Sequence, residues 1–340
     1  MKRHLLTPIL IFVALILILG LACSIPFIQP TDPIEQPIDD PSQVQPDPVD
    51  QPVDDPNQVQ ADLPPTPAGM VPVPAGNFQM GCVPSEYFDC APGHYSFDRE
   101  LPQHTVYLDG FFIDIHEVTN SQYAQCVAAG VCADPKSHIG FTTGETVYDD
   151  AHYGDPQYAN YPVTFITWTD ADNYCTWVGK SLPTEAQWEK AARGSSDTRM
   201  WPWGNTYPTC ALLNFWNHDT PNNEGMCGTN LNGCATAAVG SYPEGASPYG
   251  VMDIAGNVWE WTADWAIEDY YTYYEPDAWP ANPFPSEEEL DAVGGTELKV
   301  VRGGGWNSNY LDIRLTGRQF FDVTEYSSGN TIGFRCVSNP

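Results

Sequence analysis

The chain has 340 residues, of which 44 are acidic and 13 are basic, so its formal net charge is −31. This charge argues against binding to nucleic acid, or to anionic lipid through a basic patch, because both need clustered Lys and Arg. Aromatic residues make up 13% of the chain, which excludes a wholly disordered protein, and 28 Gly with 32 Pro favour a loop-rich globular domain over a helical bundle.

Residues 1–23 have the composition of a secretory signal. Lys2 and Arg3 precede an uncharged apolar run over 5–21, and Cys23 follows. This order resembles a bacterial lipoprotein signal, which implies that Cys23 becomes the lipidated N-terminus, although Gly20 stands where such signals usually carry Leu. An uncleaved anchor is the alternative, because an apolar run of this length barely spans the ~30 Å hydrocarbon core of a bilayer. Both interpretations place the rest of the chain outside the cytoplasm, at the membrane.

Residues 24–66 are predicted to be a disordered linker. They contain nine Asp or Glu, eleven Pro and no Lys or Arg, and segment 36–45 recurs with few changes as 51–60. Proline and mutual repulsion between acids favour an extended, solvated chain, which at ~3.1 Å per residue reaches up to about 130 Å. One interpretation is a stalk that holds a domain away from the membrane. The other is a duplicated segment that has no function of its own.

One globular domain is predicted over 67–340, and it begins with local signals for helices and strands. Thr119 and Thr184 each have a Gln three residues further on, the spacing of a capping box that starts a helix. Apolar residues three and four apart over 168–178 predict a helix between them. Short apolar runs at 105–108 and 299–302 are typical of strands.

The segments 201–250 and 270–295 are rich in Gly, Asn and Pro and are predicted to be irregular, which requires disulfides or metal ions to hold them. Nine Cys follow Cys23, and outside the cytoplasm such thiols normally pair. Close spacing predicts the pairs Cys82–Cys90 and Cys126–Cys132. Because nine is odd, one thiol is left over or pairs with another chain.

A set of nine motifs occurs in order through the domain. They are Met70 to Gly81, Glu100 to Val106, Glu117 to Asn120, Tyr161 to Val163, Leu182 to Glu189, Trp201 to Gly204, Gly256 to Trp261, Val301 to Trp306 and Gly333 to Cys336. Together they resemble the formylglycine-generating enzyme family, also called the sulfatase-modifying factor family. The resemblance implies an α+β fold related to C-type lectins, in one domain with little regular secondary structure.

The resemblance also implies an activity and a copper site. Family enzymes oxidise a Cys in a Cys-x-Pro-x-Arg segment of a client sulfatase to formylglycine, with molecular oxygen and a copper(I) ion held by two thiolates. In this sequence Ser308 stands where the first thiolate is expected, Gly305 replaces the usual Ser, and no Cys occurs between Cys234 and Cys336. Copper is therefore not expected.

The disulfide and calcium positions of the family match this sequence more fully than the copper site does. The resemblance implies a bridge between Cys175 and Cys336, and among the three remaining Cys we favour Cys210 with Cys234, which leaves Cys227 odd. One structural calcium site maps to Asp253, Gly256, Val258 and Glu260, and a second maps to Asn214 and Phe215 with Asn232 and, less directly, Cys234. Carboxylate and carbonyl oxygens are the ligands that Ca²⁺ prefers.

Two classes of function follow. The first is a tethered, non-catalytic protein that binds an unidentified protein or glycan, with exposed aromatic side chains at 270–274 and 306–310 as stacking surfaces. The second is a divergent formylglycine-generating oxidase that acts on a client sulfatase. Conversion of a Cys-x-Pro-x-Arg peptide discriminates between the two.

Overall fold

A computed structural model describes residues 65–83, 98–135, 153–195, 199–217, 221, 225–227, 236–323 and 331–340. The predicted signal at 1–23, which includes Cys23, lies outside these residues. Nearly all of the predicted linker does too. In the part of the chain that is described, no helix is both long enough and apolar enough to cross a membrane.

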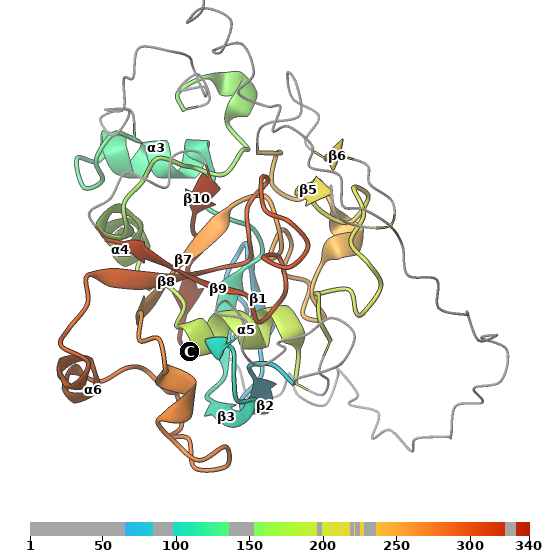
Figure 1. The fold of residues 1–340 in the computed structure, drawn as a ribbon. Helices are drawn as coiled ribbons and strands as arrows, with labels where there is room; N and C mark the ends of the chain where they lie inside the picture. Colours follow the sequence, from blue (N-terminus) through green and yellow to red (C-terminus); the bar gives the residue numbers. More distant parts are fainter. Residues whose placement is uncertain are drawn as a thin grey trace, which may run out of the picture. The chain divides into compact units, whose positions relative to one another are not determined.

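In the described residues, short strands and four α-helices alternate with long irregular stretches (Figure 1). The strands are β1 (Met70–Val73), β2 (Gly76–Met80), β3 (His104–Leu108), β4 (Phe111–Asp114), β5 (Trp216–Asn217), β6 (Gly225–Met226), β7 (Trp259–Trp265), β8 (Leu298–Arg302), β9 (Arg318–Asp322), β10 (Ile332–Gly333) and β11 (Val337–Ser338). The helices are α3 (Asn120–Ala128), α4 (Trp168–Trp177), α5 (Glu185–Arg193) and α6 (Glu287–Ala292), with 3₁₀ turns η4 (Pro156–Tyr158), η5 (Pro243–Gly245) and η6 (Tyr270–Thr272). This mixed architecture confirms the predicted fold class.

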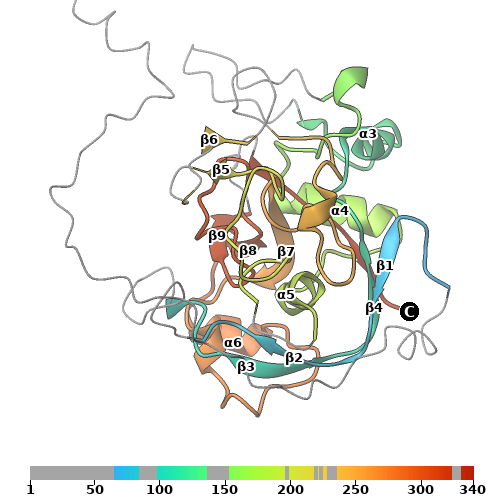
Figure 2. The same cartoon turned by 90° about the vertical axis from the view of Figure 1, so that its right-hand side faces the viewer.

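The strands form small sheets that join distant parts of the chain. The largest has the order β10-β7-β8-β9, with β10 parallel to β7 and the other pairs antiparallel. A second sheet has the order β1-β4-β11, so β4 lies between the first strand and the last, and β2 pairs with β3 (Figure 2). Helix α5 contacts strands of both regions, namely β2, β3, β7 and β8, so it occupies the centre of the fold (Figure 1).

Local signals place the helices where the sequence predicts them. Thr119 and Thr184 cap α3 and α5 through complete capping boxes, and the apolar pattern at 168–178 forms α4 with Thr167 as its cap. The predicted strands at 105–108 and 299–302 are the cores of β3 and β8.

Helix α6 was missed, because it lies in a segment predicted to be irregular. Its six residues are too few for an apolar period, but Ser286 and Glu289 form a capping box with the same spacing as the others. A search for capping boxes alone identifies it.

The disulfides confirm two predicted pairs and correct a third. Cys126 bonds to Cys132, and Cys175 in α4 bonds to Cys336 next to β11. Cys82 is in a disulfide, while Cys90 lies outside the described residues. The three fully described bridges indicate an oxidising, extracytoplasmic compartment.

The predicted pair of Cys210 with Cys234 is wrong, because Cys210 bonds to Cys227. Strands β5 and β6 pair with each other, and the Cys227 amide donates to the Phe215 carbonyl at 3.1 Å. This hairpin brings the Cα atoms of Cys210 and Cys227 to 4.9 Å, a contact that spacing along the chain does not reveal. Cys234 itself lies outside the described residues.

Candidate functional site

The loop over 303–317 connects β8 to β9 and begins with a tight glycine turn. Gly304 has φ +75°, and a Cβ atom there would lie 2.6 Å from Cγ2 of Ile313, so this position requires glycine. The amide of Gly305 donates to Oγ of Ser308 at 3.0 Å, and the Ser308 amide donates to the Gly305 carbonyl at 2.9 Å. The turn is therefore closed by hydrogen bonds.

Ser308, at the position expected for a copper-binding thiolate, is built into this turn. Its side chain is buried, and its carbonyl accepts from the Trp216 amide at 2.9 Å. Every cysteine that the structure describes is in a disulfide. In the described part of the domain, Ser308 thus has no thiolate neighbour with which to share a copper ion.

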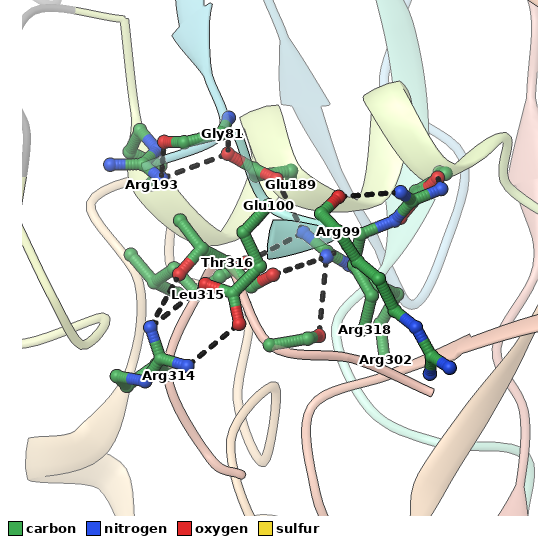
Figure 3. Close-up of polar contacts among 12 residues, drawn as sticks. Gly81, Arg99, Glu100, Glu189, Arg193, Arg302, Arg314, Leu315, Thr316 and Arg318 are labelled. Atoms are coloured by element: carbon green, nitrogen blue, oxygen red, sulfur yellow. Dashed lines mark hydrogen bonds and ion pairs between the residues drawn. The ribbon is translucent and has the colours of Figure 1, made fainter. Parts of the chain in front are cut away.

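A buried network of ion pairs fixes the loop from one side (Figure 3). Glu189 of α5 accepts from Arg302, at the end of β8, and from Arg193 at 2.8 Å. The Gly81 amide donates to Oε1 of Glu189 at 2.9 Å. Burial alone would raise the pKa of Glu189, but Arg193, Arg302 and the Gly81 amide outweigh it and hold the pKa below its ordinary value.

Arg302 also binds the main chain of the loop. Its guanidinium donates to the carbonyls of Leu315, Thr316 and Gly317 at 2.6 to 3.1 Å. Figure 3 shows this side chain reaching from the sheet toward the loop. A planar group with five donors is suited to joining one carboxylate and three carbonyls at once.

Two further ion pairs hold the 303–317 loop and the strand β9 that follows it. Arg314 of the loop binds Glu100 through two parallel hydrogen bonds of 2.7 and 2.8 Å (Figure 3). Arg318 of β9 binds Glu185 of α5 in the same manner, at 2.6 and 2.9 Å. All four side chains are buried. Such bidentate pairs fix orientation as well as distance, so the loop presents a preformed surface.

A second buried cluster lies at the start of β7. Both carboxylate oxygens of Glu260 accept from Arg335 at 2.7 Å, and Trp188 donates to one of them at 2.9 Å. Asn257, which has φ +59°, donates to Glu117 at 3.0 Å and accepts from the Ala237 amide at 2.8 Å. The turn before β7 is therefore tied to three other segments of the chain.

The first set of predicted calcium ligands lies in this turn. Asp253, Gly256, Val258 and Glu260 follow one another within eight residues, and all are buried. Burial raises the pKa of Asp253 to about 6, and its Oδ2 accepts the one hydrogen bond that its carboxylate receives from described residues, from the Gly240 amide at 2.5 Å. Glu260 receives three of the roughly four hydrogen bonds that a carboxylate accepts. Each carboxylate thus keeps capacity for a cation, and these residues fit the ion.

The second set is described only in part. Asn214 and Phe215 are buried side by side, but the Phe215 carbonyl already accepts from the Cys227 amide. Asn232 lies outside the described residues, as does Cys234. No group of three or more His, Cys, Asp or Glu side chains able to hold a metal occurs among the described residues, so a site here depends on carbonyl oxygens.

The aromatic side chains predicted to be stacking surfaces are mostly core. Tyr270 and Tyr271 are 4% and 1% exposed, and Trp306 is also buried. Tyr270 and Tyr271 belong to the same core cluster as the apolar side chains of α5, and burial is the commoner fate of large apolar rings. Tyr273, at 37% exposure, and the half-buried Tyr310 remain accessible.

Sequence reasoning missed the charged residues that support the site. Glu117, Glu189, Arg302 and Arg335 all lie within the motifs that carry the family resemblance, yet charged residues normally predict a surface. The signal was present: acids and arginines recur inside otherwise apolar motifs, and buried charges must be paired.

The chain is similar to known proteins over this whole domain. A family model described as the sulfatase-modifying factor enzyme 1-like domain matches residues 56–340. A formylglycine-generating enzyme of Thermomonospora curvata is 33% identical over 311 residues, covering 80% of this chain and 94% of that protein. A mouse protein named inactive C-alpha-formylglycine-generating enzyme 2 is 27% identical, covering 79% and 85%. The solved structure of PvdO from Pseudomonas aeruginosa is 26% identical, with a TM-score of 0.53 and coverage of 80% and 94%.

Proposed function

Because the chain belongs to the sulfatase-modifying factor enzyme 1-like family, we propose that it works in this fold by binding a protein or glycan and does not make formylglycine. The observation that carries the proposal is Ser308. Its hydroxyl closes a buried turn at the motif where the family enzymes place a copper-binding thiolate. A hydroxyl does not replace a soft thiolate on copper(I).

The rest of the site supports the same conclusion. No Cys lies between Cys234 and Cys336, and the described thiols are committed to disulfides. The 303–317 loop is held by paired arginines and glutamates, so its outer surface is already ordered before a ligand arrives. A preformed surface lowers the entropy lost on binding.

The test is incubation with a Cys-x-Pro-x-Arg peptide, O₂ and Cu(I), read by mass spectrometry. We expect no loss of mass at the peptide Cys above a metal-free blank, for the wild type and for Ser308→Cys alike, because one thiolate does not form a two-thiolate site. The Thermomonospora curvata relative serves as the positive control.

The alternative is a divergent oxidase acting on a client sulfatase. The 33% identity to a formylglycine-generating enzyme favours it. Conversion of the peptide Cys to an aldehyde by the wild-type protein would establish this alternative and reject the binding role.

The same family membership leads us to propose bound calcium and a membrane tether. Asp253 and Glu260, with the carbonyls of Gly256 and Val258, would hold one calcium ion and brace the turn before β7. Cys23 would carry the lipid, with 24–66 as the stalk. Cys23→Ser should move the protein from the membrane fraction to the soluble fraction, and retention in the membrane would favour the uncleaved anchor.

A further inference from the structure

Two segments without charged residues lie side by side at the candidate site. They are 200–212 and the first part of the loop, 303–311, and neither contains Asp, Glu, Lys or Arg. Apolar side chains of both segments pack in one cluster, and the Leu315 amide of the loop donates to the Met200 carbonyl at 2.9 Å. In a chain with a net charge of −31, these segments form a surface that differs in charge from the rest of the molecule.

A row of aromatic rings crosses the two segments. The Trp203 ring stacks on that of Trp201, with 6.2 Å between centroids and 2° between planes. The row continues to Tyr207 at 6.0 Å from Trp201, and then to Tyr310 of the loop at 6.1 Å from Tyr207. Trp201 is buried, whereas the other three residues are half-buried. Three partly exposed rings are therefore held in place by a buried one.

Two asparagines next to these rings in the sequence present oriented amide groups. Oδ1 of Asn205 accepts from the Met200 amide at 2.8 Å, and Oδ1 of Asn309 accepts from the Leu311 amide at 2.8 Å. Fixing the oxygen of a planar amide also fixes the direction of its NH₂ group. Neither NH₂ group donates to a described residue, and Asn205 is exposed. The surface thus offers two preoriented donors beside its rings.

The charged residues that border the two segments do not give the surface a charge of its own. Arg199 donates to the Pro202 carbonyl at 2.8 Å, which directs its guanidinium to the main chain. Asp312 is half-buried, and burial raises its pKa above the ordinary value. Recognition at this surface therefore depends on rings and neutral donors.

This chemistry defines the ligand. A basic protein is attracted to the acidic parts of the chain and not to segments without charge, and an anionic ligand is repelled by the net charge of the molecule. A wholly apolar ligand would leave the two amide donors unpaired. A neutral sugar has an apolar C–H face for the rings and hydroxyl oxygens that accept from the amides.

We propose that this surface binds a neutral glycan, with Trp203, Tyr207 and Tyr310 against the sugar rings and with Asn205 and Asn309 as donors to its hydroxyl oxygens. The inference rests on the proposed binding function and selects a glycan over a protein as the ligand. Tyr and Trp suit such a contact, because each combines an apolar ring with a polar tip that stays in water.

The test is calorimetric titration of the full-length protein with four neutral hexasaccharides, namely maltohexaose, cellohexaose, chitohexaose and mannohexaose. Hexagalacturonic acid is the anionic probe of similar length. At least one neutral hexasaccharide should bind saturably, and at least about fivefold more tightly than the acid, because the acid meets a molecule of the same sign of charge.

Variants of the surface identify the groups that bind. Tyr310→Ala should weaken binding about three- to tenfold, the value of one stacking contact, whereas Tyr310→Phe keeps the ring and should change it by less than about twofold. Asn205→Asp keeps the oxygen that accepts from Met200 but replaces the donor, and should weaken binding about tenfold. Tyr273→Ala, at a tyrosine that is 37% exposed and outside both segments, is the matched control and should bind as the wild type does.

The proposal is overturned if the wild type binds none of the four hexasaccharides or binds the acid as tightly. It is equally overturned if Asn205→Asp, an exposed substitution that should not disturb folding, and folded Tyr310→Ala both keep the wild-type affinity. Absence of glycan binding would not alter the result of the separate peptide assay for formylglycine. In that case a protein would replace the glycan as the ligand of the proposed function.

Discussion

The residues that decide this structure are charged and buried. Glu189, Arg302, Glu260 and Arg335 each have 0% exposure, and every one is joined to an opposite charge. Breaking such a pair costs more than the pair itself contributes, because the remaining charge stays buried without compensation. Single substitutions at Glu189 and Arg302 therefore test the support of the 303–317 loop, and substitutions at Glu260 and Arg335 test that of the turn before β7.

Glu189→Gln should lower the free energy of unfolding by about 3–5 kcal/mol, because it leaves Arg193 and Arg302 without their common carboxylate. Urea denaturation measures the change. Glu244→Gln, on the surface, should shift the same quantity by less than about 0.5 kcal/mol. A loss below about 1 kcal/mol in Glu189→Gln would contradict the structural role of the network.

Asp264 should make stability depend on pH. It accepts from the Glu185 amide at 2.7 Å, and burial, followed by the charge of Glu185, raises its pKa to about 7 from an ordinary value of 3.8. Because the folded chain holds this proton more tightly than the unfolded chain, its stabilising effect is complete below about pH 4 and disappears as the pH rises through 7. Lys299 and Arg318 act in the opposite direction but do not cancel the shift.

Asp264→Asn removes this titration. The unfolding free energy of the wild type should fall relative to that of the variant between pH 4 and pH 7, as measured by urea denaturation at each unit of pH. Parallel curves for the two proteins would show that Asp264 keeps its ordinary pKa in the fold.

At the level of elements, helices begin at local signals but are positioned by long-range bonds. All four described α-helices start at a Thr or Ser with a complete capping box. Helix α4, by contrast, is fastened to the end of the chain by Cys175–Cys336, across 161 residues, while Cys126–Cys132 spans six. In a chain-entropy description the stabilisation grows with the length of the closed loop.

Replacing both Cys175 and Cys336 by Ala should lower the free energy of unfolding by about 5 kcal/mol, and replacing Cys126 and Cys132 by Ala should lower it by about 2 kcal/mol. Denaturant unfolding of the two double variants measures the difference directly. Equal losses would mean that strain or residual structure, and not loop length, governs these bridges.

At the level of the whole molecule, much of the described chain is irregular, and paired charges and disulfides hold it in place. The turn at 253–258 contains positive φ angles at Asp253, Gly256 and Asn257 and lies at the junction of several segments. Bound calcium at this turn would stabilise the entire fold, because a ligand that binds only the folded state adds its binding free energy to stability.

The purified protein should contain calcium and no stoichiometric copper by elemental analysis. Removal of calcium by a chelator should lower Tm, and Ca²⁺ should restore it where Mg²⁺ does not, since Mg²⁺ demands a stricter octahedral geometry. Asp253→Ala should remove most of the calcium-dependent shift, with Glu244→Gln as the unaffected control. Tightly bound copper would reject this prediction and revive the oxidase.

Much of the fold could be predicted because its signals are short patterns of neighbouring residues or motifs in a fixed order along the sequence. A capping box needs two residues three apart, the pair Cys126–Cys132 needs only close spacing, and the ordered motifs from Met70 to Cys336 specify the family and its fold. The absence of cysteine around Ser308 is likewise a property of the sequence. These features can be identified without knowing which residues contact one another in the folded chain.

Other features were decided only by the tertiary structure, because they join residues that are distant in sequence. The partner of Cys210 depends on the β5–β6 hairpin, and Tyr271 is core because it joins a cluster of apolar side chains from distant segments. Glu117 lies 140 residues from Asn257, which donates to one of its oxygens, and the other oxygen has no hydrogen-bond partner among the described residues. Burial and charge compensation are sums over all neighbours in space, so only the folded chain determines them.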